Sequence, residues 1–510
     1  MDTFPWWNEE QIEFQKKLED FVNKNRPKTE EAYWAKRFPW DVMKEVAKAG
    51  IMGAGVPKEY GGLGLGATGS CIAAEQLGRL CVVGHIFVVS MLGGLHQLKV
   101  FGTESQKKRW LGQIAKGEKL GAVCITEIFA GSDAAAIKTS AVKEGDEWIL
   151  NGKKRFITGA GPAHRYCVYA QTSDNLADIK SYKHLTAFIV EKGTPGFHLE
   201  KINSLIGIDN VPNGYLDFNN VRLTDENKIG EVGKGWEVMM SGLNFERLIG
   251  SAVMSGGIWD AACLVSHFTK RRYQFRQPTR GFVNNQFIIA DMIMRSKIAR
   301  MITFYTALLL DSGKEPAIES SIAKLINTNY AMETGLAGVQ AIGGDGLTKF
   351  YPIERLIRDA KIGQIVAGTN EIQKLIIYRT AMFAMEKDLR LPYRLQMHPE
   401  LKVPCATIDP SPFQGKEINE ENILKVLAED YRVNPGIYMT VDDIKNIIGG
   451  SRVKIREVLE KLAEQKLVVI QKDRKDKIDM AIAQYTGLRK AYPLEHYKWF
   501  PDWYAEEDMF

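Results

Sequence analysis

The sequence has few cysteines and histidines, and neither residue type falls into a known ligand spacing. Six cysteines are spread over 510 residues without a CxxC pair, which argues against a disulfide framework or a zinc site. The eight histidines form no HExxH pattern, which argues against a metalloprotease-type centre. We therefore expect no bound metal.

Strong net charge and targeting signals are missing as well. A formal charge of +5 over 510 residues does not point to a nucleic-acid-binding chain. The first residues, MDTFPWWNEEQIEF, lack both the apolar core of a signal peptide and the arginine-rich character of a transit peptide. No apolar run is expected to be long enough to span a bilayer. These absences predict a cytoplasmic protein without a membrane span.

The hydrophobic content of 45% is high enough for a large core, and the length predicts two to four domains. Apolar residues recur at helical spacing first, then in short strand-like runs such as EWILNGKKRF and HLTAFIVEK, then at helical spacing again. This order predicts an α+β multidomain chain. Its predicted parts are an all-α domain (1–119), a central β domain (120–235) and a helical domain (236–390).

The C-terminal part begins with a Pro-rich stretch that we interpret as a linker, residues 391–415. Residues 416–510 then read as three helices, a two-stranded wing and an acidic, aromatic tail, which resembles a winged helix-turn-helix. Residues 401–510 hold 17 Lys and Arg against 19 Asp and Glu, a net charge of −2. Because a DNA reader needs a basic face, we expect this extension to pack against a protein partner instead, and nucleic acid is an unlikely ligand.

The most informative stretch is GAVCITEIFAGSD, residues 121–133, a short apolar run that stops at small and polar residues. Thr126 offers a hydroxyl there, and 30 positions later Phe156 supplies an aromatic face. Thr158 adds a second hydroxyl. An apolar plate beside converging hydroxyls and amides would suit an isoalloxazine ring. The alternative, a strand end that caps a helix, stays open on this stretch alone.

CITEIFAGSD followed by FITGAG resembles the acyl-CoA dehydrogenase family, flavoproteins that desaturate acyl thioesters. The resemblance covers about residues 1–390. It implies an N-terminal all-α domain, a central β-barrel or sandwich and a C-terminal four-helix bundle. It also implies FAD, an acyl-CoA substrate and a homotetramer or homodimer. An electron-transfer flavoprotein or a similar acceptor would take the electrons, and the helix containing residues 88–95 would line the acyl pocket.

Desaturation needs a base for the proton beside the carbonyl, while a hydride leaves the next carbon for flavin N5. Most of the family carries this base as the Glu of a Tyr-Glu-Gly-Thr motif, but here the matching position in QIVAGTNEIQ is Ala367. A branch that includes the isovaleryl-CoA and long-chain enzymes uses a Leu-x-x-Glu-Arg-Leu motif instead. GLNFERLIG matches that motif and makes Glu246 the expected catalytic residue. The alternative is a structural ion pair between Glu246 and a nearby arginine.

The resemblance also assigns binding residues, some of them on an Arg-x-x-Phe element and a QAIGG turn that hold a neighbouring subunit's flavin. The expected substrate-binding residues are Ser132, Asn244, Arg247 and Gly368. The expected cofactor-binding residues are Ile125, Thr126, Ser132, Phe156, Ile157, Thr158, Arg272, Phe275, Gln286, Gln340, Gly343, Gly344, Thr369 and Glu371.

Several positions depart from the family pattern. Ile128 replaces a Pro, Phe156 replaces the Trp beside the flavin, and Asp209 stands where an Arg is common. Together with Ala367 these three changes predict an unusual acyl group, such as a cyclic or branched one. In the Arg-x-x-Phe element, Arg276 replaces a Gly and three extra residues precede Gln286. Two further functions stay open: an acyl-CoA oxidase, and a flavin-containing DNA-binding protein of the alkylation-response type.

Overall fold

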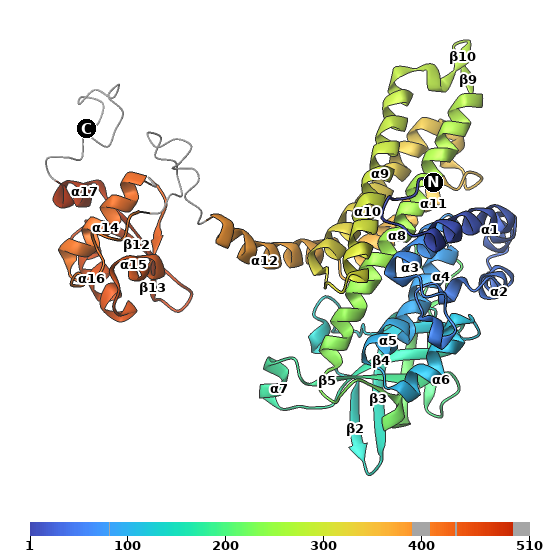
Figure 1. Ribbon diagram of the computed structural model, residues 1–510, viewed down its shortest axis with the longest axis horizontal. Helices are drawn as coiled ribbons and strands as arrows, with labels where there is room; N and C mark the ends of the chain where they lie inside the picture. Colours follow the sequence, from blue (N-terminus) through green and yellow to red (C-terminus); the bar gives the residue numbers. More distant parts are fainter. Residues whose placement is uncertain (81, 390–407, 434–435, 493–510) are drawn as a thin grey trace. The chain divides into compact units, whose positions relative to one another are not determined.

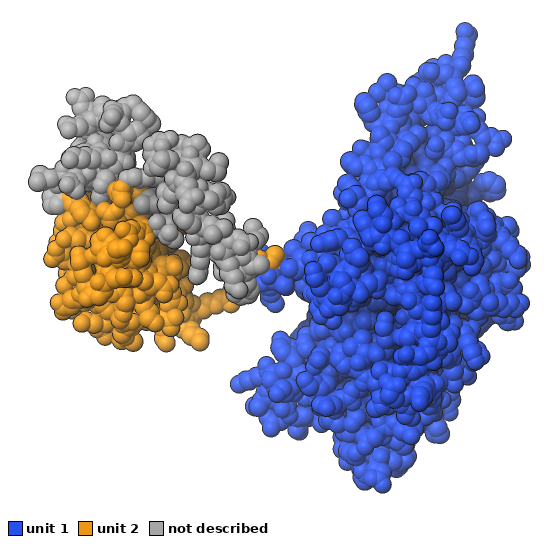
Figure 2. All heavy atoms as spheres, viewed as in Figure 1, with its two compact units in different colours: residues 1–380 blue, residues 381–510 orange. Residues whose placement is uncertain are grey.

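The computed structural model describes residues 1–80, 82–389, 408–433 and 436–492, with side chains of 383–389 excepted. It divides into two compact units, Met1–Thr380 and Ala381–Phe510, coloured separately in Figure 2. Most of the predicted linker 391–415 and the whole of the predicted acidic, aromatic tail, residues 499–510, lie outside the described residues.

The first unit opens with helices whose ends are fixed by side-chain caps. Asn8 caps the first helix and Thr103 caps the last, each in a reciprocal capping box with a glutamine at the third helical position. The most buried is α3, where nearly every residue is inaccessible. The helices of this region are α1 (Glu9–Trp34), α2 (Trp40–Lys48), α3 (Gly66–Gly78), α4 (Val82–Ser90), α5 (His96–Phe101) and α6 (Glu104–Ala115).

The stretch around residues 88–95, which we expected to form one helix lining the acyl pocket, is mostly buried but broken in the middle. A π-helical segment, Met91–Leu95, separates α4 from α5, and Gly94 has a φ of 121° that only glycine adopts readily. A Cβ on Gly93 would lie 2.2–2.3 Å from the backbone of Gly121 and Ala122. Two glycines at this point therefore let the first β-strand lie directly against the helix.

The central region is a single antiparallel-rich sheet with the order β6-β7-β3-β2-β4-β5-β8, and β1 adds to β4 in parallel. The strand-like runs of the sequence correspond to β3, β4, β5 and β7, whereas the shorter β2, β6 and β8 carried no clear pattern. The strands are β1 (Gly121–Cys124), β2 (Ser140–Glu144), β3 (Glu147–Thr158), β4 (Arg165–Gln171), β5 (Leu185–Glu191), β6 (Phe197–Ile202), β7 (Asn213–Thr224) and β8 (Lys228–Ile229).

The helical region that follows is dominated by three long helices that pack along each other (Figure 1). A short hairpin of β9 (Tyr273–Gln274) and β10 (Gln277–Pro278) joins the first two. The helices are α8 (Gly235–Arg271), α9 (Val283–Asp311), α10 (Ala317–Ile342), α11 (Ile353–Ile365) and α12 (Asn370–Leu389). The expected sequence of helical, sheet and helical regions is confirmed.

Two helical stretches, Val82–Phe101 and Gly235–Arg271, are long and apolar enough to cross a membrane. This corrects the expectation that no apolar run reaches that length. Both stretches are mostly buried inside the protein. Their hydropathy is accounted for by core packing, since a helix that is apolar on all faces must be covered by something.

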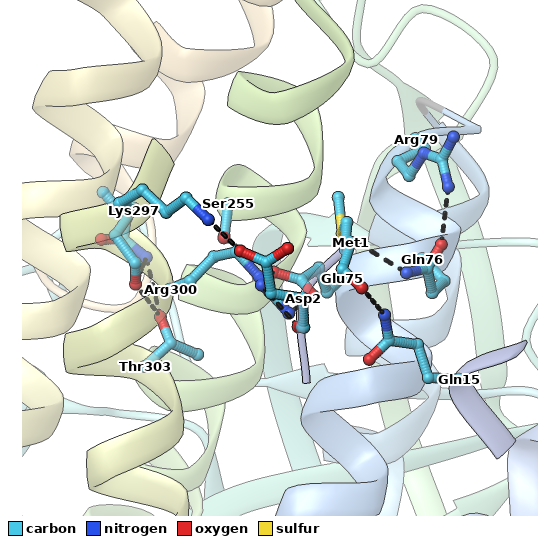
Figure 3. Close-up of polar contacts among 12 residues, drawn as sticks. Met1, Asp2, Gln15, Glu75, Gln76, Arg79, Ser255, Lys297, Arg300 and Thr303 are labelled. Atoms are coloured by element: carbon cyan, nitrogen blue, oxygen red, sulfur yellow. Dashed lines mark hydrogen bonds and ion pairs between the residues drawn. The ribbon is translucent and has the colours of Figure 1, made fainter. Parts of the chain in front are cut away.

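A buried ion pair ties the N-terminal helices to the bundle. Arg300 of α9 donates to Glu75 of α3 through both Nε and Nη2, at 2.8 and 3.2 Å, and Ser255 of α8 donates to the same carboxylate at 2.9 Å. Figure 3 shows these three side chains beside the N-terminal segment, where Lys297 pairs with Asp2. A paired and hydrogen-bonded charge is tolerated in a core, whereas an unpaired one is not.

The second unit has its own core, which includes Ile423, Leu427, Leu459 and Leu462. Ile408 and Phe413, which we had assigned to the linker, pack into this core as well. This part of the chain contains a three-stranded sheet, with the strand order β11-β13-β12, and the four helices given below. The elements are α14 (Glu420–Val433), β11 (Met439–Thr440), α15 (Val441–Ile448), α16 (Arg452–Glu464), β12 (Val468–Lys472), β13 (Ile478–Ala483) and α17 (Tyr485–Ala491).

Candidate active site

A cavity that is partly open to solvent lies in the first unit where α4, β3, α8, α10 and the end of α11 meet. Four residues singled out from the sequence line it together: Thr158 of β3, Glu246 and Arg247 of α8, and Ala367 after α11. Val88 and Val89 of α4 contribute apolar wall, whereas residues 90–95 of the helix expected to line the acyl pocket are not among the lining residues. Side chains more than 200 residues apart in sequence therefore share one site.

Glu246 lies on α8 with its side chain partly exposed to this cavity. No hydrogen bond or ion pair engages its carboxylate among the residues that the structure describes, so the alternative of a structural ion pair finds no support. Burial raises the pKa of Glu246 to about 7, against the opposing pull of the Arg247 and Lys324 charges. An acid with such a pKa can both accept and release a proton near neutral pH.

Arg247 forms its hydrogen bonds with Ala367 and Asn244 and not with its neighbour Glu246. Its Nε donates to the carbonyl of Ala367 at 3.2 Å, and its Nη1 donates to Oδ1 of Asn244 at 2.8 Å. Burial lowers its pKa to about 10, which leaves it charged at neutral pH. Arg247 thus holds the turn at Ala367 against α8. The role of Asn244 and Arg247 in binding CoA stays a prediction.

Lys324 of α10 is a cavity residue that sequence reasoning missed. It is only 3% exposed, and its Nζ donates to the carbonyls of Gln364 and Gly368 and to Oδ1 of Asn370, at 3.1, 3.0 and 2.8 Å. Burial lowers its pKa to about 7, and the Arg247 charge adds to this effect. A lone lysine among small and apolar residues in SSIAKLINT was the available signal.

The turn at Ala367 is held in an unusual backbone conformation. Ala367 has a φ of 56° and Gly368 a φ of 85°, both in the left-handed region, which costs a non-glycine residue about 1 kcal/mol or more. Gln373 and Lys324 both donate to the Gly368 carbonyl. Of the other predicted residues here, Thr369 accepts from the Ile372 amide at 3.3 Å, and Glu371 is exposed in the first turn of α12.

The loop after β1 is fixed by a buried ion pair between Glu127 and Lys154. Lys154 Nζ lies 2.7 Å from Glu127 Oε1 and also donates to the Ile125 carbonyl at 3.1 Å. The other Glu127 contacts are the amides of Lys138 and Thr139, at 2.7 and 3.0 Å. Burial alone would raise the pKa of Glu127, but Lys154 and these donors hold it below its usual range. Glu127 therefore shapes the loop, while the partly exposed Thr126 side chain stays available for a ligand.

Opposite this loop, β3 ends in the FIT segment. Phe156 is 45% exposed with a φ of 58°, Ile157 is buried, and Thr158 accepts a hydrogen bond from Asn213 Nδ2 at 3.1 Å. Arg155 lies over the Phe156 ring at 4.2 Å from its centroid. Ser132 is exposed in the loop after β1. An exposed aromatic ring held by strained backbone is a feature that a functional site explains better than packing does.

The remaining predicted cofactor residues lie around the hairpin of β9 and β10, which follows the C-terminal end of α8 (Figure 1). Phe275 is 87% exposed at the hairpin tip. Ala341 and Ile342 pack with Phe268 and Ile288, which places the neighbouring QAIGG turn at this same end. A single chain therefore does not bring this group to Thr158. The group consists of Arg272, Phe275, Gln286, Gln340, Gly343 and Gly344.

Over the described ranges, no cluster of three or more histidine, cysteine, aspartate or glutamate side chains is arranged to hold a metal ion. The site consequently offers hydroxyls, amides, an aromatic face and one carboxylic acid of raised pKa, but no metal cage. Such a donor set fits an organic cofactor with polar edges better than an ion.

Three family models match consecutive parts of the chain. They are the acyl-CoA dehydrogenase N-terminal domain over residues 8–118, the middle domain over 122–221 and the C-terminal domain over 233–382. None of these three models extends past residue 382, so residues 383–510 lie outside them.

Curated relatives are similar over nearly their whole length. An acyl-CoA dehydrogenase of Bacillus subtilis (strain 168) is 37% identical over 374 residues, which is 72% of this chain and 97% of that one. An acryloyl-CoA reductase (NADH) of Anaerotignum propionicum is 38% identical over 349 residues, 68% of this chain and 87% of that one.

Solved structures superpose on most of this chain. Butyryl-CoA dehydrogenase from Megasphaera elsdenii superposes with a TM-score of 0.71 at 33% identity, covering 75% of this chain and all of that one. The FAD complex of PigA superposes with a TM-score of 0.70 at 25% identity, covering 75% of this chain and 99% of that one.

Proposed function

The chain belongs to the acyl-CoA dehydrogenase family, and we propose that it is an FAD-dependent enzyme in which Glu246 removes the α-proton of an acyl-CoA thioester. As a family member it is an oxidoreductase acting on acyl-CoA. The desaturated product would carry a double bond between the α- and β-carbons.

This assignment is supported by the fact that Glu246 and Ala367 line the same cavity. Ala367 keeps the left-handed turn but has no group that can move a proton. Glu246 lines the same space, and its pKa of about 7 suits a base at neutral pH. The geometry thus supports a relocated acid in place of the missing one.

The residues around Thr126 and Thr158 fit a flavin, although no cofactor is part of the structure. The Thr126 side chain is partly exposed, the Phe156 ring is exposed beside it on β3, and Thr158 reaches the cavity of Glu246. Ile125, Ile157, Ser132, Thr369 and Glu371 would complete this half of the site. When bound, FAD would accept the hydride from the β-carbon.

The chain's own residues would then position and deprotonate the substrate. Val88, Val89 and Gly250 give the acyl group an apolar seat that excludes water, which strengthens electrostatic interactions in the site. Arg247 and Lys324 fix the turn at Gly368 through their hydrogen bonds. Their positive charges also favour the ionised form of Glu246 between turnovers.

The far group of cofactor residues leads us to propose a homo-oligomer, most simply a homotetramer. Arg272, Phe275 and Gln286 would complete the flavin site of a neighbouring subunit, and the Gln340–Gly344 turn would do so as well. An electron-transfer flavoprotein or a similar acceptor would dock near Phe156, whose ring is exposed. A cytoplasmic location stays a prediction.

For the second unit we propose a winged-helix fold that docks a protein. Its order of elements, with a short Gly449-Gly450 turn between α15 and α16, supports that fold. Helix α16 carries four basic side chains, Arg452, Lys454, Arg456 and Lys461, against three exposed carboxylates, Glu457, Glu460 and Glu464. It therefore lacks the strongly basic face that DNA phosphates require.

The proposed base is tested by Glu246→Gln, with Glu237→Gln as the matched control. Glu237 lies on the same helix, but it is exposed and pairs with Lys234. We expect Glu246→Gln to retain FAD and acyl-CoA binding while its flavin bleaching by acyl-CoA falls at least about 10³-fold. The control should bleach like the parent enzyme.

Full bleaching by Glu246→Gln would remove this residue from the mechanism. Oxygen consumption measured in the same assay separates a dehydrogenase from an oxidase. An oxidase would turn over without any added electron acceptor.

A further inference from the structure

A second cavity continues from the catalytic one along the same helices. His85, Val253 and Met254 line both cavities and form the wall between them. On α8, the residues that line the two cavities follow helical spacing: Glu246 and Gly250 in the first, Gly257, Ala261 and Leu264 in the second. One face of α8 therefore runs through both.

Helix α11 repeats this arrangement. Ile362 and Gly363 line the catalytic cavity, whereas Leu356 and Asp359 line the second one. Because α8 and α11 contact each other, both cavities lie in one trough between these helices. An acyl chain that leaves the site of Glu246 and follows this trough must reach the wall at Val253 and Met254.

The lining side chains become more polar and charged beyond Val253 and Met254. The catalytic cavity is mainly apolar past Glu246, but the second cavity contains ion pairs. Arg26 binds Asp260 through two hydrogen bonds of 2.8 and 2.7 Å, and Arg355 binds Glu30 through two of 2.9 and 2.6 Å.

Arg79 is held less tightly than these pairs. It donates to Gln76 at 2.9 Å and lies 3.5 Å from Asp260. The formal charge of the side chains that line this cavity is balanced, because three arginines lie with three carboxylates. These are Arg26, Arg79 and Arg355, with Glu30, Asp260 and Asp359.

The length of the apolar section can be estimated from α8. Val253 lies seven positions after Glu246, which corresponds to about 10 Å at 1.5 Å per residue. Carbon–carbon bonds of about 1.5 Å in a zigzag advance roughly 1.3 Å each, so about eight carbons span this distance. A chain of that length would place its last atoms at the wall.

We propose that the second cavity receives a neutral, hydrogen-bonding group at the distal end of a medium-length acyl chain, a hydroxyl being the simplest example. This inference rests on the proposed function. A methyl end would strip water from ion pairs without replacing its hydrogen bonds, which is costly. A hydroxyl can donate to a carboxylate and accept from a guanidinium, whereas an added charge would upset a balanced set.

The wall is suited to opening for such a chain. Met254 has an unbranched, flexible side chain that adapts to different shapes. Gly250, just before it on the same face, has open space where a Cβ would lie. Movement of the Met254 side chain would join the two cavities without a backbone change.

The test compares four CoA esters by kcat/KM in flavin bleaching: butyryl, octanoyl, 8-hydroxyoctanoyl and the mono-CoA ester of octanedioic acid. We expect 8-hydroxyoctanoyl-CoA to exceed octanoyl-CoA by at least about tenfold, because a site built for a hydroxyl discriminates against its absence. A preference for octanoyl-CoA, or for the carboxylate-ended ester, would overturn the proposal. Failure of all four esters to bleach the flavin would instead contradict the proposed function itself.

Arg79→Met removes the least constrained donor of the second cavity. The ratio of kcat/KM for 8-hydroxyoctanoyl-CoA to kcat/KM for octanoyl-CoA should then fall to within about threefold of unity. Because both values are measured on the same variant, a general loss of activity cancels in this ratio. Arg79→Gln, which keeps an amide donor, should retain most of the preference and guards against a folding defect. Arg222→Met, on the exposed surface of β7, serves as the control. An unchanged ratio in Arg79→Met would contradict the assignment of this cavity.

Discussion

At the scale of single residues, the site depends on one carboxylic acid in a low-dielectric cavity. Glu246 makes no compensating hydrogen bond in the described protein, so its charged form is disfavoured and its pKa rises to about 7. The same side chain on the protein surface would be fully ionised and a weaker base. Burial therefore supplies the basicity that the proposed reaction needs.

The pH dependence of the rate should follow this titration. Only the ionised carboxylate can accept the α-proton, so kcat/KM should rise with pH and level off above about 7. Below about pH 7, kcat/KM should increase about tenfold for each pH unit. A profile that is flat between pH 5.5 and 8.5 in stopped-flow bleaching would contradict Glu246 as the titrating base.

The residue scale also gives a stability effect with a defined sign. The folded protein binds the Glu246 proton up to pH about 7, whereas the unfolded chain releases it near 4.5. Stability should therefore fall between these pH values, by an amount on the order of 3 kcal/mol. In urea unfolding at pH 8, Glu246→Gln should be more stable than the parent, and the difference should vanish at pH 4.5. Equal stability at both pH values would show that the acid is not strained in the fold.

At the scale of elements, the loop after β1 is held by a pair that no cofactor needs to touch. Lys154 on β3 is fully buried, and its partner Glu127 also accepts two backbone amides. This arrangement fixes the distance between Thr126 and Phe156, since Arg155 also donates its amide to the Thr126 carbonyl at 2.8 Å. The half of the site that we propose to hold the flavin is thus preorganised by an internal ion pair.

Lys154→Met should disturb that half selectively. It leaves Glu127 buried without its cation, which costs about 3–5 kcal/mol. We expect a lowered unfolding midpoint and loss of FAD during gel filtration. The double variant Lys154→Met with Glu127→Gln should recover part of the stability, because the unpaired charge is gone. A single variant that retains both stability and flavin would show that the pair is dispensable.

Helix α8 offers a second test at this scale. Gly250 lies one turn after Glu246, and nothing is within 4 Å of the position of a Cβ there. Gly250→Leu should fill the apolar cavity, so activity with octanoyl-CoA should fall about tenfold or more relative to butyryl-CoA. Thermal stability should not fall, because glycine is a poor helix former. Gly250→Ala is the matched control, and an unchanged chain-length profile in Gly250→Leu would contradict the path of the acyl group.

At the scale of the whole molecule, the first unit exposes an apolar stripe along α9. Val283, Phe287, Met294, Met301 and Tyr305 are between 47% and 66% exposed and follow each other at helical spacing. Contiguous apolar surface of this kind is uncommon on monomers and marks an interface. The stripe supports the proposed oligomer.

The double variant Phe287→Glu, Met294→Glu should dissociate that oligomer. Light scattering would report a smaller particle, and FAD content should fall because the proposed site draws residues from two subunits. Glu144→Lys, an exposed change on the sheet, is the control. A double variant with unchanged mass and flavin content would place the subunit contact elsewhere.

The family and the order of its regions could be predicted from sequence because their signals are local. Strand ends such as CITE, the FIT segment and the helical periodicity after residue 235 each occupy a short stretch. The proposed relocation of the acid could also be inferred from sequence, because Glu246 and Ala367 each lie in a recognisable motif. By contrast, the break at Gly93 depends on a close contact with Gly121, which no local pattern encodes.

What the sequence determined by itself was chemistry at single positions: which acid can act as a base, which hydroxyls can meet a flavin, and where alanine cannot serve. Only the tertiary structure decided how these groups act together. Burial and cavity shape arise from contacts between distant segments, so the raised pKa of Glu246, the supporting bonds of Lys324 and the charged cavity beyond Met254 became visible only after folding.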